Sequence, residues 1–161
     1  SQFVESYLKL QKYRFGSRLS YSIEIQQECS GYKIPKLSLV TFVENACVHG
    51  IEDKAAHCWI FVKVFTKQEY LYMEIEDTGS GISEAYLSTL RDRMEHASIE
   101  MLKQSGRVGV VNACLRLKMF TDGNVKFTLE SEENVGTIVT ISVPVQFLNR
   151  EAEKDAKSSD C

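Results

Sequence analysis

The segment from Tyr70 to Asp77 alternates strictly between two kinds of side chain. Leu71, Met73 and Ile75 are apolar, and the residues between them are tyrosines or glutamates. Because successive side chains of a strand point to opposite faces, this pattern predicts a half-buried strand. Asp77 keeps step with the apolar positions, so its carboxylate is predicted to point into the protein. A carboxylate in that place needs hydrogen-bond partners, and this requirement constrains both the fold and the function.

Other segments of the chain have similarly clear periodicities. Strands are predicted over residues 19–25, 58–65, 70–77, 125–129 and 137–143. Helices are predicted over 1–15 and 36–49 and from Gly109 onward, and a mixed, mobile segment with some helix is expected after Gly81. The last two strands are predicted to pair as an antiparallel hairpin around Asn134 and Gly136. This order favours a two-layer α/β sandwich, with a mixed sheet of about five strands covered by helices on one face.

Length and composition indicate one ordinary globular domain. The 161 residues carry a net charge of −3, which excludes nucleic-acid binding by bulk electrostatics. No run of roughly 18 apolar residues is present, so no membrane span is predicted. The five cysteines form no C-x-x-C pair, which is typical of reduced thiols. The boundaries predicted are a helix over 1–16, a domain over 17–147 and a charged, disordered tail over 148–161.

The predicted helix over 36–49 is apolar almost all round, yet it contains several polar residues. Thr41, Asn45 and His49 are four residues apart, so they share one face, and Glu44 precedes Asn45. An asparagine oxygen is a suitable Mg²⁺ ligand. The alternative is that Glu44 and Asn45 only bridge to nearby backbone groups. A buried polar side chain without a partner costs about 1–3 kcal/mol, which favours a functional interpretation of this pair.

Asp77 is followed by two glycines, Gly79 and Gly81, in a D-x-G-x-G pattern. A buried carboxylate can accept hydrogen bonds from the exocyclic amine of adenine and from a water molecule. The glycines would let the backbone approach a purine and turn sharply. The pattern alone is weak evidence, because Asp-Gly turns are common. A binding site is favoured because the alternation of the strand points the Asp77 side chain into the protein.

Two further patterns follow in the chain. Residues 106–109 read Gly-Arg-Val-Gly before a predicted helix, and the free N–H groups of such a helix start favour an anion such as phosphate. A flexible loop before an ordinary helix is the alternative. Thr137 follows Gly136 and is predicted to point inward near Asp77, although a threonine at a strand edge is common. Neither a Walker-type phosphate loop nor a G-x-G-x-x-G pattern between a strand and a helix is present.

The order of these four patterns resembles that of the GHKL ATPases. Within that superfamily the chain is similar to LytS/YesM-type sensor histidine kinases. The segments that carry the resemblance are 7–15, Ile34-Pro35, 43–46, 49–51, 77–81, 109–112 and Arg116-Leu117. The likeness covers residues 5 to about 145 and implies the Bergerat fold, with ATP and Mg²⁺ bound beside a flexible lid.

The resemblance implies a role for each matching residue. Asn45 would bind Mg²⁺ and Asp77 the adenine, with Thr137 supporting the adenine contact. Gly79, Gly81 and Gly109 would shape the pocket, Asn112 and His49 would lie near the phosphates, and Glu44 would orient a water or a neighbouring side chain. Arg107 stands where the family usually has the first glycine of a G-x-G, and it could contact a phosphate. Thr41 replaces the glutamate of the ATPase branches, which disfavours efficient ATP hydrolysis.

The resemblance also implies partners. The phospho-accepting histidine of this family lies upstream of the helix over 1–16, in a dimerisation region, and the phosphate passes to a response regulator. The chain would then be the cytoplasmic catalytic domain of a membrane-anchored bacterial sensor. Three alternatives stay open: another GHKL ATPase or serine kinase, a degenerate GHKL module that binds a partner protein without nucleotide, and a plain α/β binding domain with fortuitous glycines.

Overall fold

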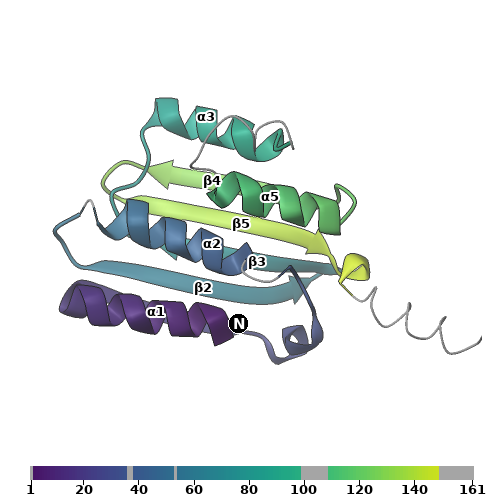
Figure 1. The fold of residues 1–161 in the computed structure, drawn as a ribbon, viewed down its shortest axis with the longest axis horizontal. Helices are drawn as coiled ribbons and strands as arrows, with labels where there is room; N and C mark the ends of the chain where they lie inside the picture. Colours follow the sequence, from purple (N-terminus) through teal and green to yellow (C-terminus); the bar gives the residue numbers. More distant parts are fainter. Residues whose placement is uncertain (1, 36–37, 53, 99–108, 149–161) are drawn as a thin grey trace, which may run out of the picture.

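A computed structural model of the chain describes residues 2–35, 38–52, 54–98 and 109–148. One sheet lies beneath a layer of helices (Figure 1). The helices are α1 (Gln2–Phe15), α2 (Ser38–Asn45), α3 (Glu84–Glu95) and α5 (Gly109–Phe120), and the strands are β1 (Leu19–Ile25), β2 (Cys58–Lys67), β3 (Tyr70–Asp77), β4 (Lys126–Glu132) and β5 (Gly136–Pro144). Shorter helical turns are η1 (Gly16–Arg18), η2 (Gln27–Gly31), η3 (Ala46–Ile51) and η4 (Val145–Phe147).

The sheet is mixed and five-stranded, in the order β1-β2-β3-β5-β4. Strand β1 is parallel to β2, and every other neighbouring pair is antiparallel. The predicted two-layer α/β sandwich and the hairpin of the last two strands are therefore confirmed. Strand β3 is central, so the end of β3 lies deep within the sheet rather than at an edge.

The inward phase of Asp77 is confirmed by the register of the sheet. Asp77 lies opposite Ile60 of β2 on one side and Thr137 of β5 on the other. Its side chain is 6% exposed, on the face that the helices cover. The β2–β3 connection is a tight turn in which Gln68 and Glu69 both have positive φ, as a two-residue hairpin turn requires.

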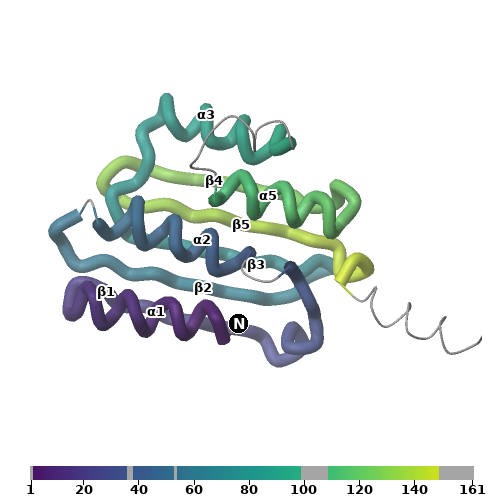
Figure 2. Tube along the Cα trace, in the orientation of Figure 1, coloured from purple at the N-terminus to yellow at the C-terminus, as the bar shows by residue number. Residues whose placement is uncertain are grey.

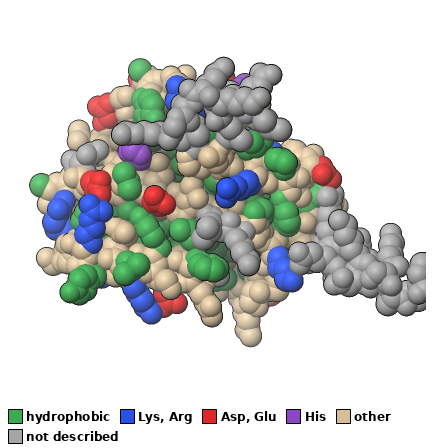
Figure 3. Space-filling view, viewed as in Figure 1, with side chains coloured by type: hydrophobic (Ala, Val, Ile, Leu, Met, Phe, Trp, Pro, Cys, Tyr) green, Lys and Arg blue, Asp and Glu red, His purple; other side chains and the backbone are tan. Residues whose placement is uncertain are grey.

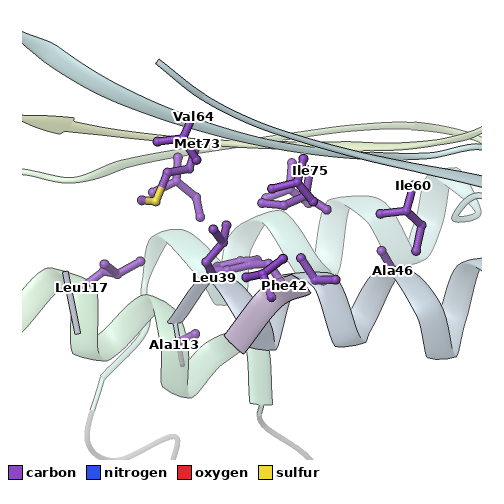
Figure 4. Packing of buried hydrophobic residues seen from close by; sticks show 14 of the residues in the cluster. Leu39, Phe42, Ala46, Ile60, Val64, Met73, Ile75, Ala113 and Leu117 are labelled. Carbon is purple, nitrogen blue, oxygen red and sulfur yellow. The ribbon is translucent and has the colours of Figure 1, made fainter. Parts of the chain in front are cut away.

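The core lies between the sheet and the helices. In Figure 4 the apolar side chains of β2 and β3 face those of α2 and α5. The labelled members are Leu39, Phe42, Ala46, Ile60, Val64, Met73, Ile75, Ala113 and Leu117. The helical side of the molecule shows hydrophobic side chains mixed with charged ones (Figure 3). Among the described helices, none combines the length and apolar character needed to cross a bilayer.

Helix α1 belongs to this core. It packs against β1 and α2, and Figure 2 shows β1 running alongside it. Val4 and Leu8 are buried, whereas Leu10 and Tyr13 on the other side are exposed. The predicted helix at the start of the chain is thus present, and its origin as a connection to a histidine-bearing region stays a prediction.

The predicted single helix over 36–49 differs from what the structure has. The α-helical part is α2, and the chain then continues as the π-helical turn η3, while residues 36–37 lie outside the described part. The wider turn brings the backbone of Gly50 against Asp77, where an added Cβ atom would come within 2.8 Å of the Asp77 Oδ1 atom. The chain therefore departs from regular α-helix at the place where it packs against the end of β3.

The segment after Gly81 is more regular than the sequence predicted. It contains α3, whose N-cap Ser83 accepts a hydrogen bond from the Tyr86 N–H at 3.4 Å. Leu87 and Met94 are buried on its inner side. Residues 99–108, which include the predicted lid and Arg107, lie outside the described part of the chain.

Candidate functional site

A cleft of about 860 Å³ opens between α2, α3 and the start of α5. It is lined by Thr41, Glu44, Asn45, Val48, His49, Ser80, Gly81, Ile82, Ser83, Tyr86, Leu90, Arg93, Gly109, Val110 and Val111. Such a volume is typical of small-molecule sites. The cleft therefore brings together three of the four sequence patterns, from α2, from the loop after β3 and from α5.

A second, much smaller pocket of about 20 Å³ adjoins the cleft and contains Asp77 and Thr137. The two cavities share Asn45, His49, Gly81 and Ile82. The fourth pattern is thus joined to the other three, with Asp77 on the sheet side of the cleft. A space of about 20 Å³ holds roughly one water molecule, so a purine ring reaches Asp77 only after the pocket widens.

Burial raises the pKa of the Asp77 carboxyl to about 6, because a charged carboxylate loses its hydration inside the protein. The charge of Glu76 raises the pKa as well. The N–H of Gly79 donates to Asp77 Oδ1 at 2.9 Å, and this bond lowers the pKa together with the positive charge of Lys54 and the backbone N–H of Thr137. At neutral pH the carboxylate is ionised, buried and only partly satisfied, which suits it to accept a further hydrogen bond.

The glycines of this region allow two backbones to cross at close range. A Cβ atom on Gly79 would lie 2.3 Å from the Cα atom of Gly50, and one on Gly81 would lie 2.1 Å from the carbonyl oxygen of Glu132. The N–H of Ser80 donates to the Gly50 carbonyl at 3.0 Å. Each glycine is thus pressed against protein backbone and fixes the loop that follows Asp77, and the predicted approach of these glycines to a purine stays a prediction.

The polar residues of α2 and η3 lie in the cleft. Asn45 is half-buried, Glu44 and His49 are exposed, and all three line the cleft. Across the cleft stands the N-terminus of α5, where Gly109 packs near Thr41; a Cβ atom on this glycine would be 3.5 Å from Thr41 Cγ2. Carboxylate, amide and imidazole groups therefore line the same cleft as the N-terminus of α5, which is the positive end of a helix dipole.

Three predicted site residues are arranged differently from the rest. Asn112 is not among the residues that line either cavity, and its buried Oδ1 atom has no hydrogen-bond partner in the described part of the chain. Thr137 lies beside Asp77, but its hydroxyl bonds Ser131 Oγ at 2.8 Å rather than the carboxylate. Arg107 lies outside the described residues, so its contact with a phosphate stays a prediction.

Two contributions to the site have no signal in the sequence. Ser131 accepts the N–H of Ile82 at 2.8 Å, which ties β4 to the loop after Asp77. The Nζ atom of Lys54 donates to the carbonyl of Thr78 at 3.0 Å. Serine in a strand and lysine in a loop are both common, and neither periodicity nor spacing marks them as parts of a site.

Residues 35–146 match the family described as histidine kinase-, DNA gyrase B-, and HSP90-like ATPase. The chain is 30% identical over 141 residues to the sensor protein LytS of Bacillus anthracis, which covers 88% of this chain and 23% of the relative. It is 29% identical over 160 residues to the LytS of Staphylococcus saprophyticus, and this match covers 99% of this chain and 26% of the relative. The chain thus spans about a quarter of the length of these relatives.

Solved structures with a similar fold include catalytic domains of histidine kinases. The histidine kinase domain of the blue-light activated histidine kinase from Erythrobacter litoralis superposes with a TM-score of 0.61 at 16% identity, over 90% of this chain and 60% of that one. The catalytic domain of the histidine kinase ThkA superposes with a TM-score of 0.55 at 16% identity, over 87% of each chain. At this level of identity the likeness is one of fold.

Proposed function

Since the chain belongs to the histidine kinase-, DNA gyrase B-, and HSP90-like ATPase family, we propose that it is the ATP-binding catalytic domain of a two-component sensor histidine kinase. The observation that carries the proposal is the continuity between the buried carboxylate of Asp77 and the cleft beside Asn45. One end of the site suits an adenine and the other suits a triphosphate. The likeness to LytS proteins favours the kinase branch of the family.

In this proposal the Asp77 carboxylate accepts a hydrogen bond from the exocyclic amine of adenine. Asp77 is central in the sheet and fixed by the loop glycines, so the position of the base relative to the cleft is set in advance. The small volume of the pocket means that binding moves its walls, and the loop from Ser80 to Ser83 lies at that boundary.

The donor set of the cleft fits Mg²⁺. Asn45 and Glu44 offer an amide oxygen and a carboxylate on the same wall, and this cation takes oxygen ligands while keeping several waters. We propose that Asn45 holds the ion together with the nucleotide phosphates, and that Glu44 orients a water or a neighbouring group. Bound Mg²⁺ would neutralise charge that develops on the phosphates during transfer. The N-terminus of α5 would contact the phosphates, and so would His49, from the same wall of the cleft as Asn45.

The proposed acceptor is a histidine in a dimerisation region of a longer parent protein, and a response regulator would receive the phosphate next. The parent would carry this domain on the cytoplasmic side of a membrane. A second candidate, a module that binds a partner without nucleotide, is favoured by one observation only, the closed state of the pocket around Asp77.

Calorimetric titration with ATP and ADP, with and without Mg²⁺, tests the proposal. We expect binding in the micromolar to submillimolar range, strengthened by Mg²⁺ for ATP and lost in Asp77→Asn. Asp92→Asn is the matched control, because Asp92 is an exposed aspartate paired with His96 on the surface of α3. If the folded wild-type domain binds neither nucleotide, the partner-binding alternative is favoured instead.

A further inference from the structure

Resting on the proposed function, we propose that Lys54 is a positioning residue for base recognition: it holds the backbone after Asp77 that fixes the carboxylate to which adenine binds. Lys54 lies in the connection between η3 and β2 and is half-buried. It does not line either of the two cavities among the described residues. Its effect on the nucleotide therefore acts through the loop and not through contact.

The ammonium group of Lys54 reaches three carbonyl oxygens. Its Nζ atom donates to Thr78 at 3.0 Å, to Gly79 at 3.4 Å and to Asn134 at 3.4 Å. A lysine ammonium has three N–H donors, so each donor has an acceptor. Two of these carbonyls belong to the loop after Asp77 and the third to the β4–β5 turn. One side chain thus ties two neighbouring loops together.

The backbone of Lys54 is itself held in place. The guanidinium of Arg18 donates to the Lys54 carbonyl at 2.6 Å and to the Ile51 carbonyl at 3.4 Å. The Lys54 N–H donates to the Ile51 carbonyl at 3.2 Å. Arg18 also lies over the ring of Phe15, at 5.8 Å from its centroid. The ammonium therefore extends from a fixed point, which is what a positioning residue requires.

The loop that Lys54 holds is the loop that sets the carboxylate. The Gly79 N–H bonds Asp77 Oδ1 at 2.9 Å, and the Gly79 carbonyl is one of the three acceptors of Lys54. The Asn134 N–H donates to the Ser80 carbonyl at 2.7 Å, so the same two loops are bonded a second time. The positive charge of Lys54 also favours the ionised carboxylate. Loss of Lys54 leaves three carbonyls without their donor and the loop less restrained.

The test compares ATP with inosine triphosphate, which has the same phosphates but a carbonyl in place of the exocyclic amine. Calorimetry is done on the wild-type chain, on Lys54→Met, Lys54→Gln and Lys54→Arg, and on the control Lys67→Met at an exposed end of β2. We expect Lys54→Met to weaken ATP binding roughly tenfold, as for loss of a charge-assisted hydrogen bond, and to change inosine triphosphate binding much less. Lys54→Arg should restore the preference for ATP and Lys54→Gln should restore part of it.

Three results would overturn the inference. The first is that Lys54→Met binds ATP as tightly as the wild type does. The second is that Lys54→Met weakens the binding of both nucleotides equally, as a general structural defect would, and the third is that Lys54→Arg does not restore the preference for ATP. If Lys54→Met does not fold, the same comparison with Lys54→Gln decides. If the wild-type chain binds neither nucleotide, the result contradicts the proposed function instead. In that case hydrogen exchange of the Gly79 amide still tests the role of Lys54, because this exchange should be faster in Lys54→Gln than in the wild type.

Discussion

At the scale of single residues, the carboxyl of Asp77 titrates in an accessible range. Its pKa is about 6, and only the ionised form accepts a hydrogen bond from adenine on either oxygen. We therefore expect the ratio of ATP affinity to inosine triphosphate affinity to fall as the pH decreases through about 6. The ratio is used because the phosphate groups of the two nucleotides titrate alike. A ratio that does not change with pH would argue against base recognition by this carboxylate.

The same carboxyl should make stability depend on pH. Its pKa rises from 3.8 to about 6 on folding, so the folded state binds the proton more tightly. This contribution to the free energy of unfolding is fully present below pH 3.8 and is lost as the pH rises through about 6. Asp77→Asn removes the cost of burying the charge. We expect the variant to be about 1–3 kcal/mol more stable than the wild type near neutral pH, and to lose this advantage near pH 4.

Urea unfolding, followed by the fluorescence of Trp59, would measure this difference. Trp59 is the single tryptophan of the chain and lies on the sheet face away from the helices. Since the other carboxyls are common to both proteins, the difference between the two curves isolates Asp77. An Asp77→Asn variant less stable than the wild type at both pH values would show that hydrogen bonding outweighs desolvation at this position.

Gly79 should tolerate no side chain. A Cβ atom there would lie 2.3 Å from the Gly50 backbone, and neither backbone can yield without breaking the bond between Ser80 and Gly50. We expect Gly79→Ala to lower the free energy of unfolding by roughly 3 kcal/mol, as overpacking does, and to weaken ATP binding. Gly31→Ala is the control, because nothing lies within 4 Å of a Cβ atom at Gly31. Equal stability of the two variants would contradict the crossing of these backbones.

At the scale of elements, α1 should behave as part of the domain and not as a linker. Leu8 is fully buried on α1, whereas Leu10 on the same helix is 69% exposed. We expect Leu8→Ala to lower the free energy of unfolding by about 3 kcal/mol, since it leaves a cavity against β1 and α2. Leu10→Ala should change it by much less. If the two substitutions have the same small effect in urea unfolding, α1 is an appendage to the fold.

The turn η3 joins this element scale to the site. Cys47 in the turn is hydrogen-bonded to the Tyr7 hydroxyl of α1, and burial raises the pKa of the Cys47 thiol to about 12. His49, in the same turn, lines the cleft. One helical turn thus contacts α1 on one side and the candidate phosphate site on the other.

At the scale of the whole molecule, the chain should bind ATP without phosphorylating itself. Of its three histidines, His57 bonds Ser20 and the Ser17 carbonyl, and His96 pairs with Asp92. His49 lies in the cleft itself. We expect no acid-labile label on the chain after incubation with γ-labelled ATP, and label on a separately added histidine-bearing region of a LytS-type kinase. Label on His49 in the isolated chain would contradict the proposed division of roles.

Local periodicity determined the elements and the phase of Asp77. Alternation along 70–77 and the spacing of apolar residues in the helices depend only on neighbours in the chain, so the sequence alone was enough for the α/β class and for the hairpin of β4 and β5. The same local information placed Thr41, Asn45 and His49 on one face, and in the structure all three line one cleft.

Tertiary structure decided what depends on contacts between distant segments. The crossing of Gly50 with Gly79 and the three hydrogen bonds of Lys54 join residues that are 24 to 80 positions apart in the chain. The π-helical turn lies where Gly50 packs against the end of β3, so it depends on the same kind of contact. Their geometry is set by how closely two backbones approach, and no residue pattern carries that distance. Local patterns in the sequence marked Asn45, His49 and Asp77, whereas the packing of loops around Asp77 added Ser131 and Lys54 and determined how these groups are held.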